Sequence, residues 1–312
     1  MGVRLVHASL LVCAAMWGLV FIGVHELLPV LTPIQLVTVR FVIIAIAFIV
    51  MFAVFPQLRV FPTNRGDWVR FVVCGILAVP GAQIAIVAGQ QYLAPQLAAL
   101  VVATSPVLTA LFAALLLGEG FSVLRGIGSV IALLGVAFIV LFGTGDGHSI
   151  GPLTFTWPAV IAVLTPISWA LYTVMSRPLA ARYPPLATVG MCLTLGTVFL
   201  LPFLPNSVQA LGGLDGSQWA WMLYLAFGGS LLPYLIWFAS LKVLPANQTA
   251  AYMYAIPLFA MIFSWLILGR RPGVVAAIGG ALVLIGVVLT QIRPKRSEAA
   301  PAAPTLSPVE DP

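Results

Sequence analysis

The residues best able to do chemistry are polar and aromatic side chains that interrupt long apolar stretches. The candidates for a binding site are Trp17, Arg40, Gln83, Gln90, Thr104, Ser105, Trp169, Tyr172, Tyr234, Trp237, Gln248, Tyr252 and Tyr254. Guanidinium, amide and hydroxyl groups can bind the polar part of a small molecule, and aromatic rings can enclose its apolar part. The candidates for a hinge or gate are Pro106, Glu119, Pro257 and Arg270.

Arg40 is the most informative candidate, because it lies about six residues into an apolar stretch that begins near residue 34. A charge inside a membrane is costly unless it is paired or hydrated. Two interpretations follow. The long side chain can reach outward, toward Glu26, and anchor the helix at the surface. Alternatively, it can face a cavity and bind an anionic part of a substrate, such as the carboxylate of an amino acid, through two hydrogen bonds from its planar guanidinium.

The acidic residues and the cysteines do not form a catalytic or metal-binding pattern. The acidic residues fall in predicted loops, at helix ends or in the C-terminal tail: Glu26, Asp67, Glu119, Asp146, Asp215, Glu298, Glu310 and Asp311. No two of them are placed as a general acid and base. The three cysteines, Cys13, Cys74 and Cys192, fall in separate apolar stretches. We therefore expect neither an enzyme nor a bound metal or cofactor.

The composition predicts an all-α membrane protein. Of the 312 residues, 62% are hydrophobic and 7% are charged, against roughly 25% charged in a soluble domain. Apolar stretches long enough to cross a bilayer lie at about 5–23, 34–55, 68–89, 95–117, 123–142, 158–177, 186–205, 219–240, 247–268 and 273–292. We therefore predict ten transmembrane helices.

The basic residues predict the orientation of these helices. If the N-terminus is cytoplasmic, the cations on the cytoplasmic side are Arg4, Arg59, Arg65, Arg70, Arg125, Arg177, Arg182, Lys242, Arg293, Lys295 and Arg296. Arg270 and Arg271 then face outward. Because Lys and Arg gather on the cytoplasmic side of membrane proteins, we predict that both termini are cytoplasmic. Anionic lipid headgroups then account for the net charge of +6, and we expect no nucleic-acid partner.

The chain also contains an internal repeat. A shift of 151 residues aligns Pro106 with Pro257, Leu117-Gly118 with Leu268-Gly269, Gly128 with Gly279, and Gly135 with Gly286, without a gap. Each copy has five predicted helices, an odd number, so the second copy enters the membrane in the opposite orientation. Inverted repeats are typical of secondary transporters, which bind substrate between the repeats and move one against the other.

Several motifs give the chain a resemblance to a known family. They are "AMWG" at Ala15–Gly18, Arg40 in the second stretch, "SPVLTALFAALLLGE" ending at Glu119, and "SWALY" at Ser168–Tyr172. On these motifs the chain, up to about Arg293, resembles the EamA-type transporters of the drug/metabolite transporter superfamily. The resemblance implies ten helices in two inverted five-helix repeats, an inner-membrane location, and export of amino acids or related small metabolites. One motif departs from the family, because the second copy ends in Gly269-Arg270 where the family commonly repeats Gly-Glu.

The repeated prolines and glycines predict how the helices bend and pack. A proline frees a carbonyl, so Pro106 and Pro257 should face a cavity or a neighbouring helix instead of lipid, and should soften their helices. Gly118 and Gly269 should supply left-handed caps that end these helices. The glycines seven residues apart, Gly128 with Gly135 and Gly279 with Gly286, suit close helix packing within or between subunits.

We expect the two repeats to occupy residues 1–147 and 148–293, followed by a disordered cytoplasmic tail over 294–312. The expected partners are a small-molecule substrate, an amino acid or a metabolite, and membrane lipid. The chain is expected to be a monomer or a weak homodimer. A membrane channel or a sensor without active transport is the alternative class.

Overall fold

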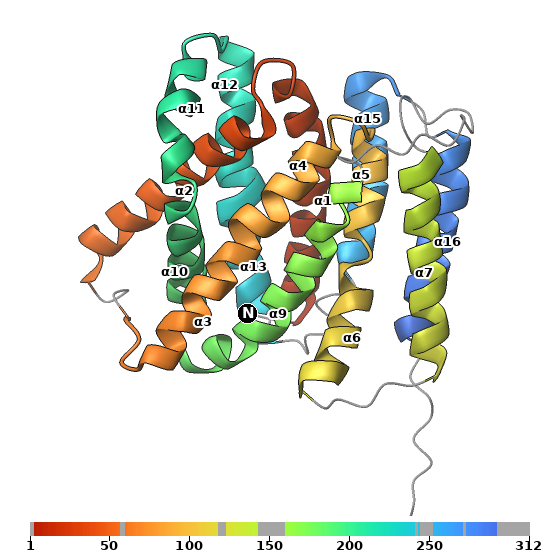
Figure 1. The fold of residues 1–312 in the computed structure, drawn as a ribbon, viewed down its shortest axis with the longest axis horizontal. Coiled ribbons are helices and arrows are strands. Elements are labelled where there is room, and N and C mark those ends of the chain that lie inside the picture. The colour runs from red at the N-terminus through yellow and green to blue at the C-terminus, as the bar shows by residue number, and fades with distance from the viewer. Residues whose placement is uncertain are drawn as a thin grey trace, which may run out of the picture.

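In the computed structural model, described for residues 3–56, 60–117, 123–142, 160–240, 243, 252–270 and 273–291, the chain is a bundle of helices (Figure 1). The helices of residues 3–142, the first half, are α1 (Val3–Leu27), α2 (Pro33–Val54), α3 (Arg65–Ile76), η2 (Leu77–Ile84), α4 (Ala85–Gly89), α5 (Pro95–Val102), α6 (Ser105–Leu117) and α7 (Val123–Phe142).

The helices of residues 160–291, the second half, follow in the same bundle. They are α9 (Leu164–Arg182), α10 (Pro185–Val198), η3 (Leu201–Phe203), α11 (Leu204–Leu211), α12 (Gly216–Leu223), η4 (Tyr224–Leu231), α13 (Leu232–Ser240), η5 (Tyr252–Ala255), α15 (Ile256–Leu268) and α16 (Val274–Gln291). Helix α1 lies at the centre of the bundle, where it packs against α13, η4 and α15 of the second half.

Several of these helices are long and apolar enough to cross a membrane. Within the described ranges, five helical segments meet that condition: Arg4–Leu27, Pro33–Val54, Arg65–Gly89, Pro95–Leu116 and Gly216–Ser240. A sixth is added if Pro185–Val198 and Leu201–Leu211, which meet at an angle of 53°, form one span. Further apolar helices are shorter, among them Tyr252–Leu268. The chain is therefore a multi-pass membrane protein.

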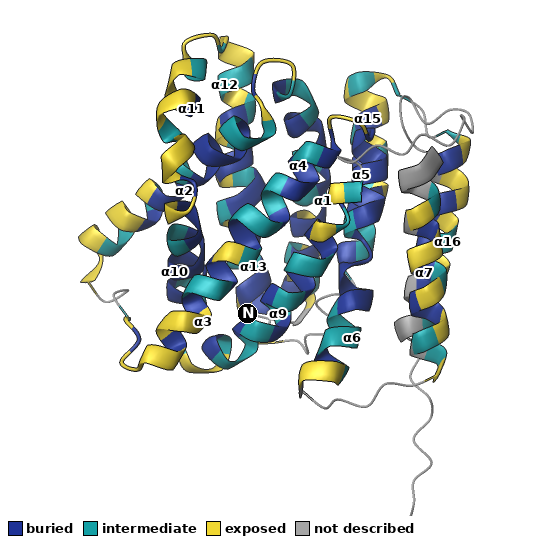
Figure 2. Ribbon diagram, in the orientation of Figure 1, coloured by how far each residue is buried: buried dark blue, intermediate teal, exposed yellow. Residues whose placement is uncertain are grey.

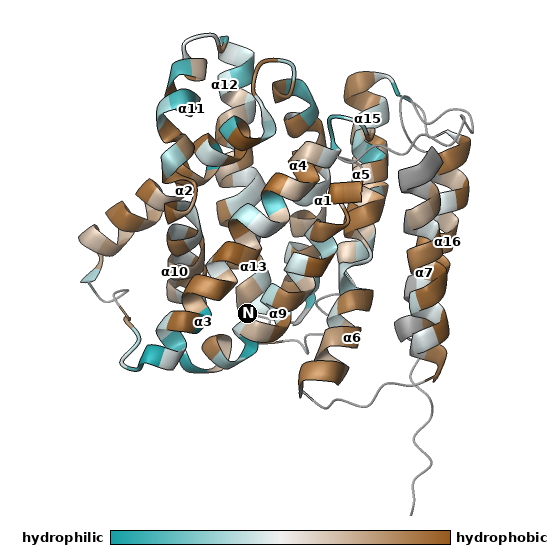
Figure 3. Cartoon of the chain, in the orientation of Figure 1, coloured by the Kyte–Doolittle hydropathy of each residue, from teal (hydrophilic) through white to brown (hydrophobic). Residues whose placement is uncertain are grey.

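The outer surface of the bundle suits lipid. Large apolar side chains point outward from α2, α7 and α16, including Ile46, Ile49, Leu134 and Ile285. Figure 2 shows exposed residues along the outer faces of these helices, and Figure 3 shows that the same helices are hydrophobic over most of their length. Hydrophilic residues collect near helix ends, such as the start of α3. An apolar surface of this extent is suited to hydrocarbon and unsuited to water.

Two predicted helices are interrupted by π-helical segments that the hydropathy pattern did not reveal. Segment η2 contains Pro80 and connects α3 to α4, and segment η4 connects α12 to α13, where Pro233 lies in the first turn. A proline has no N–H to donate, so the helix widens locally or leaves a carbonyl without its donor. Such widened turns occur frequently at functional sites.

The repeated prolines are buried, as predicted, but they do not kink continuous helices. Pro106 lies in the first turn of α6 and Pro257 in the first turn of α15. At that position the missing N–H costs nothing. The chain instead breaks just before them, at Ala103–Thr104 and in the short 3₁₀ segment η5.

The predicted glycine cap is confirmed at the end of α15. Gly269 has a left-handed backbone, with φ of 68°, and its N–H donates to the carbonyls of Ser264 and Trp265. The N–H of Arg270 also donates to the Ser264 carbonyl, at 3.2 Å. The corresponding Gly118-Glu119 turn lies outside the described residues.

Close packing between α7 and α16 confirms the prediction from the glycine spacing, within the chain. A Cβ atom at Gly135 would lie 2.9 Å from the Gly279 carbonyl oxygen, and one at Gly286 would lie 2.5 Å from the Gly128 carbonyl oxygen. Glycine is required at both positions, because any side chain would push the two backbones apart.

Candidate functional site

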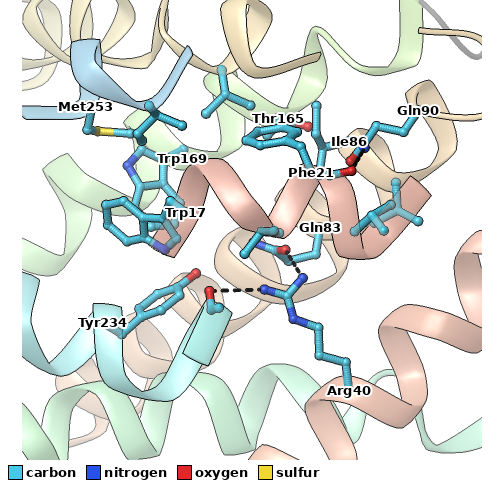
Figure 4. Close-up of a pocket in the computed structure, with 16 residues that line it drawn as sticks. Trp17, Phe21, Arg40, Gln83, Ile86, Gln90, Thr165, Trp169, Tyr234 and Met253 are labelled. Carbon is cyan, nitrogen blue, oxygen red and sulfur yellow. Dashed lines mark hydrogen bonds between the residues drawn. The ribbon is translucent and has the colours of Figure 1, made fainter. Parts of the chain in front are cut away.

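A cavity of about 70 Å³ lies in the middle of the bundle, between the two halves (Figure 4). Six of the sequence candidates line it: Trp17, Arg40, Gln83, Gln90, Trp169 and Tyr234. The remaining lining residues were not predicted and are Val20, Phe21, Val24, Ile86, Val87, Val102, Thr165, Gly229, Met253 and Ile256. The walls are therefore mostly apolar with a few polar groups, as in small-molecule sites. The volume leaves room for a few water molecules.

Arg40 lies at the side of this cavity and reaches across to the second half. Its side chain is only 2% exposed. The Nε atom donates to the Leu225 carbonyl at 3.0 Å and to the Ser230 hydroxyl at 2.9 Å. The Nη2 atom donates to the same hydroxyl at 2.6 Å and to the Gly229 carbonyl at 3.3 Å. The interpretation that Arg40 reaches outward toward Glu26 is therefore wrong.

The local structure of η4 explains why carbonyl groups are available to Arg40. Pro233 has no N–H, so the carbonyl of Gly229, four residues earlier, lacks its usual α-helical donor. Glycine at 229 also allows the close approach, because a Cβ atom there would lie 2.5 Å from the Val20 side chain and 3.7 Å from Arg40 Nη2. The guanidinium therefore satisfies backbone groups that the irregular helix exposes.

The other π-helical segment, η2, receives a donor from the opposite half in the same way. The hydroxyl of Thr165, near the start of α9, donates to the Ala82 carbonyl at 2.9 Å. From the next residue of η2, Gln83, the side-chain oxygen accepts a long hydrogen bond of 3.4 Å from Arg40 Nη1. The two irregular segments therefore meet at the cavity, and each is held by a side chain from the other half.

The Gln90 side chain has a structural role, because it connects the end of α4 to α1. Its amide nitrogen donates to the Phe21 carbonyl at 2.9 Å, and the side chain is buried. This bond fixes the end of α4 against α1. Gln90 therefore closes one end of the cavity wall and leaves Arg40 and Gln83 as the more available polar groups.

An aromatic cluster forms the wall of the cavity on the side away from Gln90. The ring of Trp17 lies 6.0 Å from that of Trp169 and 6.3 Å from that of Tyr234, centroid to centroid, with nearly perpendicular planes. Trp237 and Tyr172 pack behind these rings and do not line the cavity. Edge-to-face packing of this kind is stable and apolar. Figure 4 shows the rings of Trp17, Trp169 and Tyr234 on the side of the cavity away from Gln90.

The tyrosine hydroxyls at this wall are poorly satisfied. The hydroxyls of Tyr172 and Tyr234 are buried and make no hydrogen bond with any described residue. Buried polar groups are usually paired, so the Tyr234 hydroxyl, which lines the cavity, is available to a bound molecule.

The other sequence candidates that the structure describes do not line the cavity. The hydroxyls of Thr104 and Ser105 donate to the carbonyls of Val101 and Val102, where the chain breaks between α5 and α6. Tyr252 hydrogen-bonds His7. Tyr254 is half-buried and does not line the cavity. Gln248 and Glu119 lie outside the described residues.

A second polar contact joins the two halves at a different place, and sequence analysis did not predict it. Asp67, in the first turn of α3, is 1% exposed, and its carboxylate accepts hydrogen bonds from Arg182 Nη1 at 2.8 and 3.0 Å. The Tyr183 hydroxyl donates to the same group at 2.9 Å. Asn64 donates to it at 3.0 Å and Arg70 at 3.4 Å. The charge of Asp67 is therefore fully paired.

The charge of Arg40 at the cavity is not paired in the way that the charge of Asp67 is, because none of the sixteen described lining residues is acidic. Arg40 is the only charged residue among them. Elsewhere in the described ranges, no group of three His, Cys, Asp or Glu side chains is placed to hold a metal ion.

Gly229 and Ser230 are the residues that sequence analysis missed although a signal was present. The run "FGGSLLP" at Phe227–Pro233 places two glycines, a serine and a proline inside an apolar stretch. Glycine and proline inside a transmembrane helix mark backbone that is tolerated only beside protein or a cavity. Pro80 and Pro233 carry the same signal in the sequence as Pro106 and Pro257.

Comparison with known proteins identifies the class. The model of the EamA-like transporter family matches the chain twice, over residues 5–141 and 156–292. The chain therefore belongs to the EamA-like transporter family, in the drug/metabolite transporter superfamily. The double match fits an architecture of two repeats.

Three relatives are named as an exporter or as transporters. A protein of Streptantibioticus cattleyicolor named "Probable terminal-alkyne amino-acid exporter" is 29% identical over 236 residues, 75% of this chain and 77% of the relative. An uncharacterized transporter of Archaeoglobus fulgidus is 25% identical over 276 residues, 88% of this chain and 94% of the relative. The uncharacterized transporter YdfC of Bacillus subtilis is 26% identical over 279 residues, covering 89% and 88%.

A solved crystal structure shows a similar fold. It superposes with a TM-score of 0.59 at 22% sequence identity, and the match covers 91% of this chain and 94% of that one. At this identity the likeness concerns the fold alone.

Proposed function

We propose that this chain is a secondary transporter that exports amino acids or related small metabolites across the inner membrane by alternating access. The observation that carries the proposal is the buried guanidinium of Arg40, which lies at a cavity between the two halves where none of the described lining residues is acidic. A buried charge favours an oppositely charged partner. A cargo with a carboxylate would supply that partner.

The walls of the cavity support a cargo with an apolar part. Trp17, Trp169 and Met253 lie on one side, and Phe21 and Ile86 on another. Gln83, which contacts Arg40, and the Tyr234 hydroxyl, on the cavity wall, offer neutral polar groups. An amino acid with an apolar side chain combines the two properties, and one relative is named as an amino-acid exporter.

The arrangement we propose has ten transmembrane helices in two inverted five-helix repeats, with boundaries near residues 147 and 293 and both termini cytoplasmic. The packing of α7 against α16 supports the inversion. The shift of 151 residues makes these helices equivalent. Gly135 approaches Gly279 while Gly286 approaches Gly128, so the two helices run antiparallel and each makes the same contact with the other. Equivalent contacts of this kind are those of a two-fold axis.

The test of the proposed function is transport in proteoliposomes. A panel of radiolabelled L-leucine, L-phenylalanine, L-propargylglycine and L-lysine would be followed with and without a pH gradient. We expect saturable uptake and counterflow of at least one neutral amino acid. Flux that does not saturate and shows no counterflow would indicate a channel and contradict the proposal.

The test of the arrangement is cysteine accessibility in whole cells. Single cysteines near Arg182 and near Asp215 should be labelled from opposite sides of the membrane, the first from the cytoplasm. Labelling of both positions from one side would rule out the inverted repeat.

A further inference from the structure

We infer that Ser230 is a positioning residue, which holds the Arg40 guanidinium so that its Nη1 end is presented to the carboxylate of the cargo. The inference rests on the proposed function, because it assumes that Arg40 binds an anionic group. It assigns a role to a residue that contacts Arg40 from the second half but does not itself line the cavity.

The hydrogen-bonding capacity of Ser230 is fully used by this contact. A hydroxyl has one donor and two acceptor positions. The Ser230 hydroxyl donates to the Leu225 carbonyl at 3.0 Å, and it accepts from Arg40 Nε at 2.9 Å and from Arg40 Nη2 at 2.6 Å. Leu225 precedes Ser230 by five residues, so the side chain bridges the wide turn of η4. These three bonds fix the hydroxyl relative to both the helix and the guanidinium.

The contact with Ser230 occupies the Nε and Nη2 edge of the Arg40 guanidinium, the used edge, and leaves the Nη1 end available. A guanidinium has five N–H groups. The Nε group and the two Nη2 groups are engaged by Ser230, Leu225 and Gly229. The Nη1 atom has one hydrogen-bond partner among the described residues, the Gln83 side-chain oxygen at 3.4 Å, which is a long bond. One N–H of Nη1 therefore has no acceptor among the described residues, and the other is weakly held.

This distribution of hydrogen bonds over the guanidinium predicts which of its N–H groups bind the cargo carboxylate. The Nε and Nη2 edge, which could otherwise grip a carboxylate with two hydrogen bonds, is occupied by Ser230. A carboxylate therefore meets Nη1, with the Gln83 amide and the Tyr234 hydroxyl as additional donors from the cavity wall. If Ser230 did not hold the used edge, the guanidinium could turn and the Nη1 end would lose its fixed direction. Charge-assisted hydrogen bonds depend on that direction.

Two substitutions separate this role from a structural one. Ser230→Ala removes the hydroxyl, and Ser230→Cys replaces it with a group of similar shape that is a weak donor and acceptor. Ser240→Ala is the matched control. Ser240 is also buried, on the same helical run, and its hydroxyl donates to the Ile236 carbonyl at 2.8 Å, but it contacts neither Arg40 nor the cavity.

The measurement is discrimination between a carboxylate and its neutral amide. Purified protein would be titrated with L-leucine and L-leucinamide and with L-phenylalanine and its amide, with competition against labelled substrate in proteoliposomes as readout. In the wild type we expect the acid to be preferred by roughly tenfold or more, since a hydrogen bond to a charged group is worth that much. Ser230→Ala and Ser230→Cys should reduce this preference to about threefold or less, with weakening of the acid and little change for the amide. Ser240→Ala should keep it.

Each other outcome is decisive. If both Ser230 variants keep the wild-type preference for the acid, the positioning role is wrong while the proposed function stands. Equal weakening of acid and amide would assign Ser230 a purely structural role and also overturn the inference. If the wild type itself binds none of the acids, or binds acids and amides equally, the anionic-cargo proposal fails and the inference falls with it. Should Ser230→Ala not fold, the near-isosteric Ser230→Cys decides.

Discussion

Among the polar contacts that join the two halves of the chain, two involve buried charged side chains and treat charge in opposite ways. At the start of α3, Asp67 accepts from Arg182, Tyr183 and neighbouring groups, so that its charge is balanced by cations. At the cavity, the Arg40 guanidinium contacts carbonyl and hydroxyl oxygens, and none of the described lining residues is acidic. The paired charge of Asp67 joins two segments of the chain. The positive charge of Arg40 has no negatively charged partner among the described lining residues, so an anionic ligand can balance it.

The two contacts should also affect different properties of the protein, the stability of the fold at Asp67 and the binding of cargo at Arg40. Hydrogen bonds to neutral oxygens satisfy the geometry of the Arg40 N–H groups but do not cancel the positive charge. Arg182 is 54% exposed, so water shares in its solvation, whereas Arg40 is buried. We therefore expect changes at Asp67 to act on folding and changes at Arg40 to act on transport.

The largest effect is expected for Arg40→Lys. A lysine has three donors on one nitrogen and cannot serve Ser230, two backbone carbonyls and a cargo carboxylate together. Binding of an anionic cargo should fall at least tenfold, by roughly the value of one charge-assisted hydrogen bond. Expression and melting temperature should stay near those of the wild type. A variant that loses stability but binds cargo normally would make Arg40 an anchor and remove the contrast between the two contacts.

The second effect is a loss of stability in Asp67→Ala. The substitution removes the acceptor for Arg182, Tyr183 and Asn64, at a cost of about 1.5–3 kcal/mol for hydrogen bonds to a charged group. Thermal unfolding in detergent should show a lower melting temperature, with the preference among cargoes unchanged. Arg182→Ala should cost less, about 0–1 kcal/mol, because this partner is half exposed.

A matched control for this prediction is Asp215→Ala. Asp215 is exposed and caps α12 through the N–H of Gln218. It joins nothing across the halves, so its loss should cost about 1 kcal/mol, the usual value of a helix cap. A larger effect for Asp215→Ala than for Asp67→Ala would contradict the importance of the paired contact.

The third effect concerns an uncharged contact between the two halves, the close packing of α7 against α16. In Gly286→Ala the new Cβ atom would clash with the Ala132 amide nitrogen, so α7 and α16 must separate. Overpacking of this kind costs about 1–3 kcal/mol. Binding of cargo should be normal, because neither helix lines the cavity. Gly216→Ala, where a Cβ atom would meet nothing within 4 Å, is the control and should unfold like the wild type.

The smallest effect is expected for Pro106→Ala and Pro257→Ala. Both prolines lie in the first turn of a helix, where alanine is tolerated, so folding should remain largely intact. The breaks that precede them flank cavity residues Val102 and Ile256. Alanine allows these helices to extend through the breaks, and we expect transport to slow less than tenfold. Normal rates in both variants would mean that the repeated prolines are packing features.

The features that sequence analysis predicted correctly depend on local composition. Apolar stretches, glycine spacing and a left-handed cap at Gly269 are properties of neighbouring residues, and each follows from the chain itself. The position of Arg40 inside an apolar stretch likewise marked it before any contact was known. Trp17, Gln83, Gln90, Trp169 and Tyr234 also interrupt apolar stretches and line the cavity, and their part in binding stays a prediction.

The partners of these residues were decided by the tertiary structure alone. Whether Arg40 turns outward or inward depends on how α2 is rotated against η4, and hydropathy carries no information on that rotation. Asp67 was assigned to a helix end, yet it meets Arg182 across 115 residues of sequence because α3 and α9 lie side by side. The apolar stretches have little periodicity, since lipid and protein interior are both apolar, so the sequence determines which segments are helices but not which faces meet.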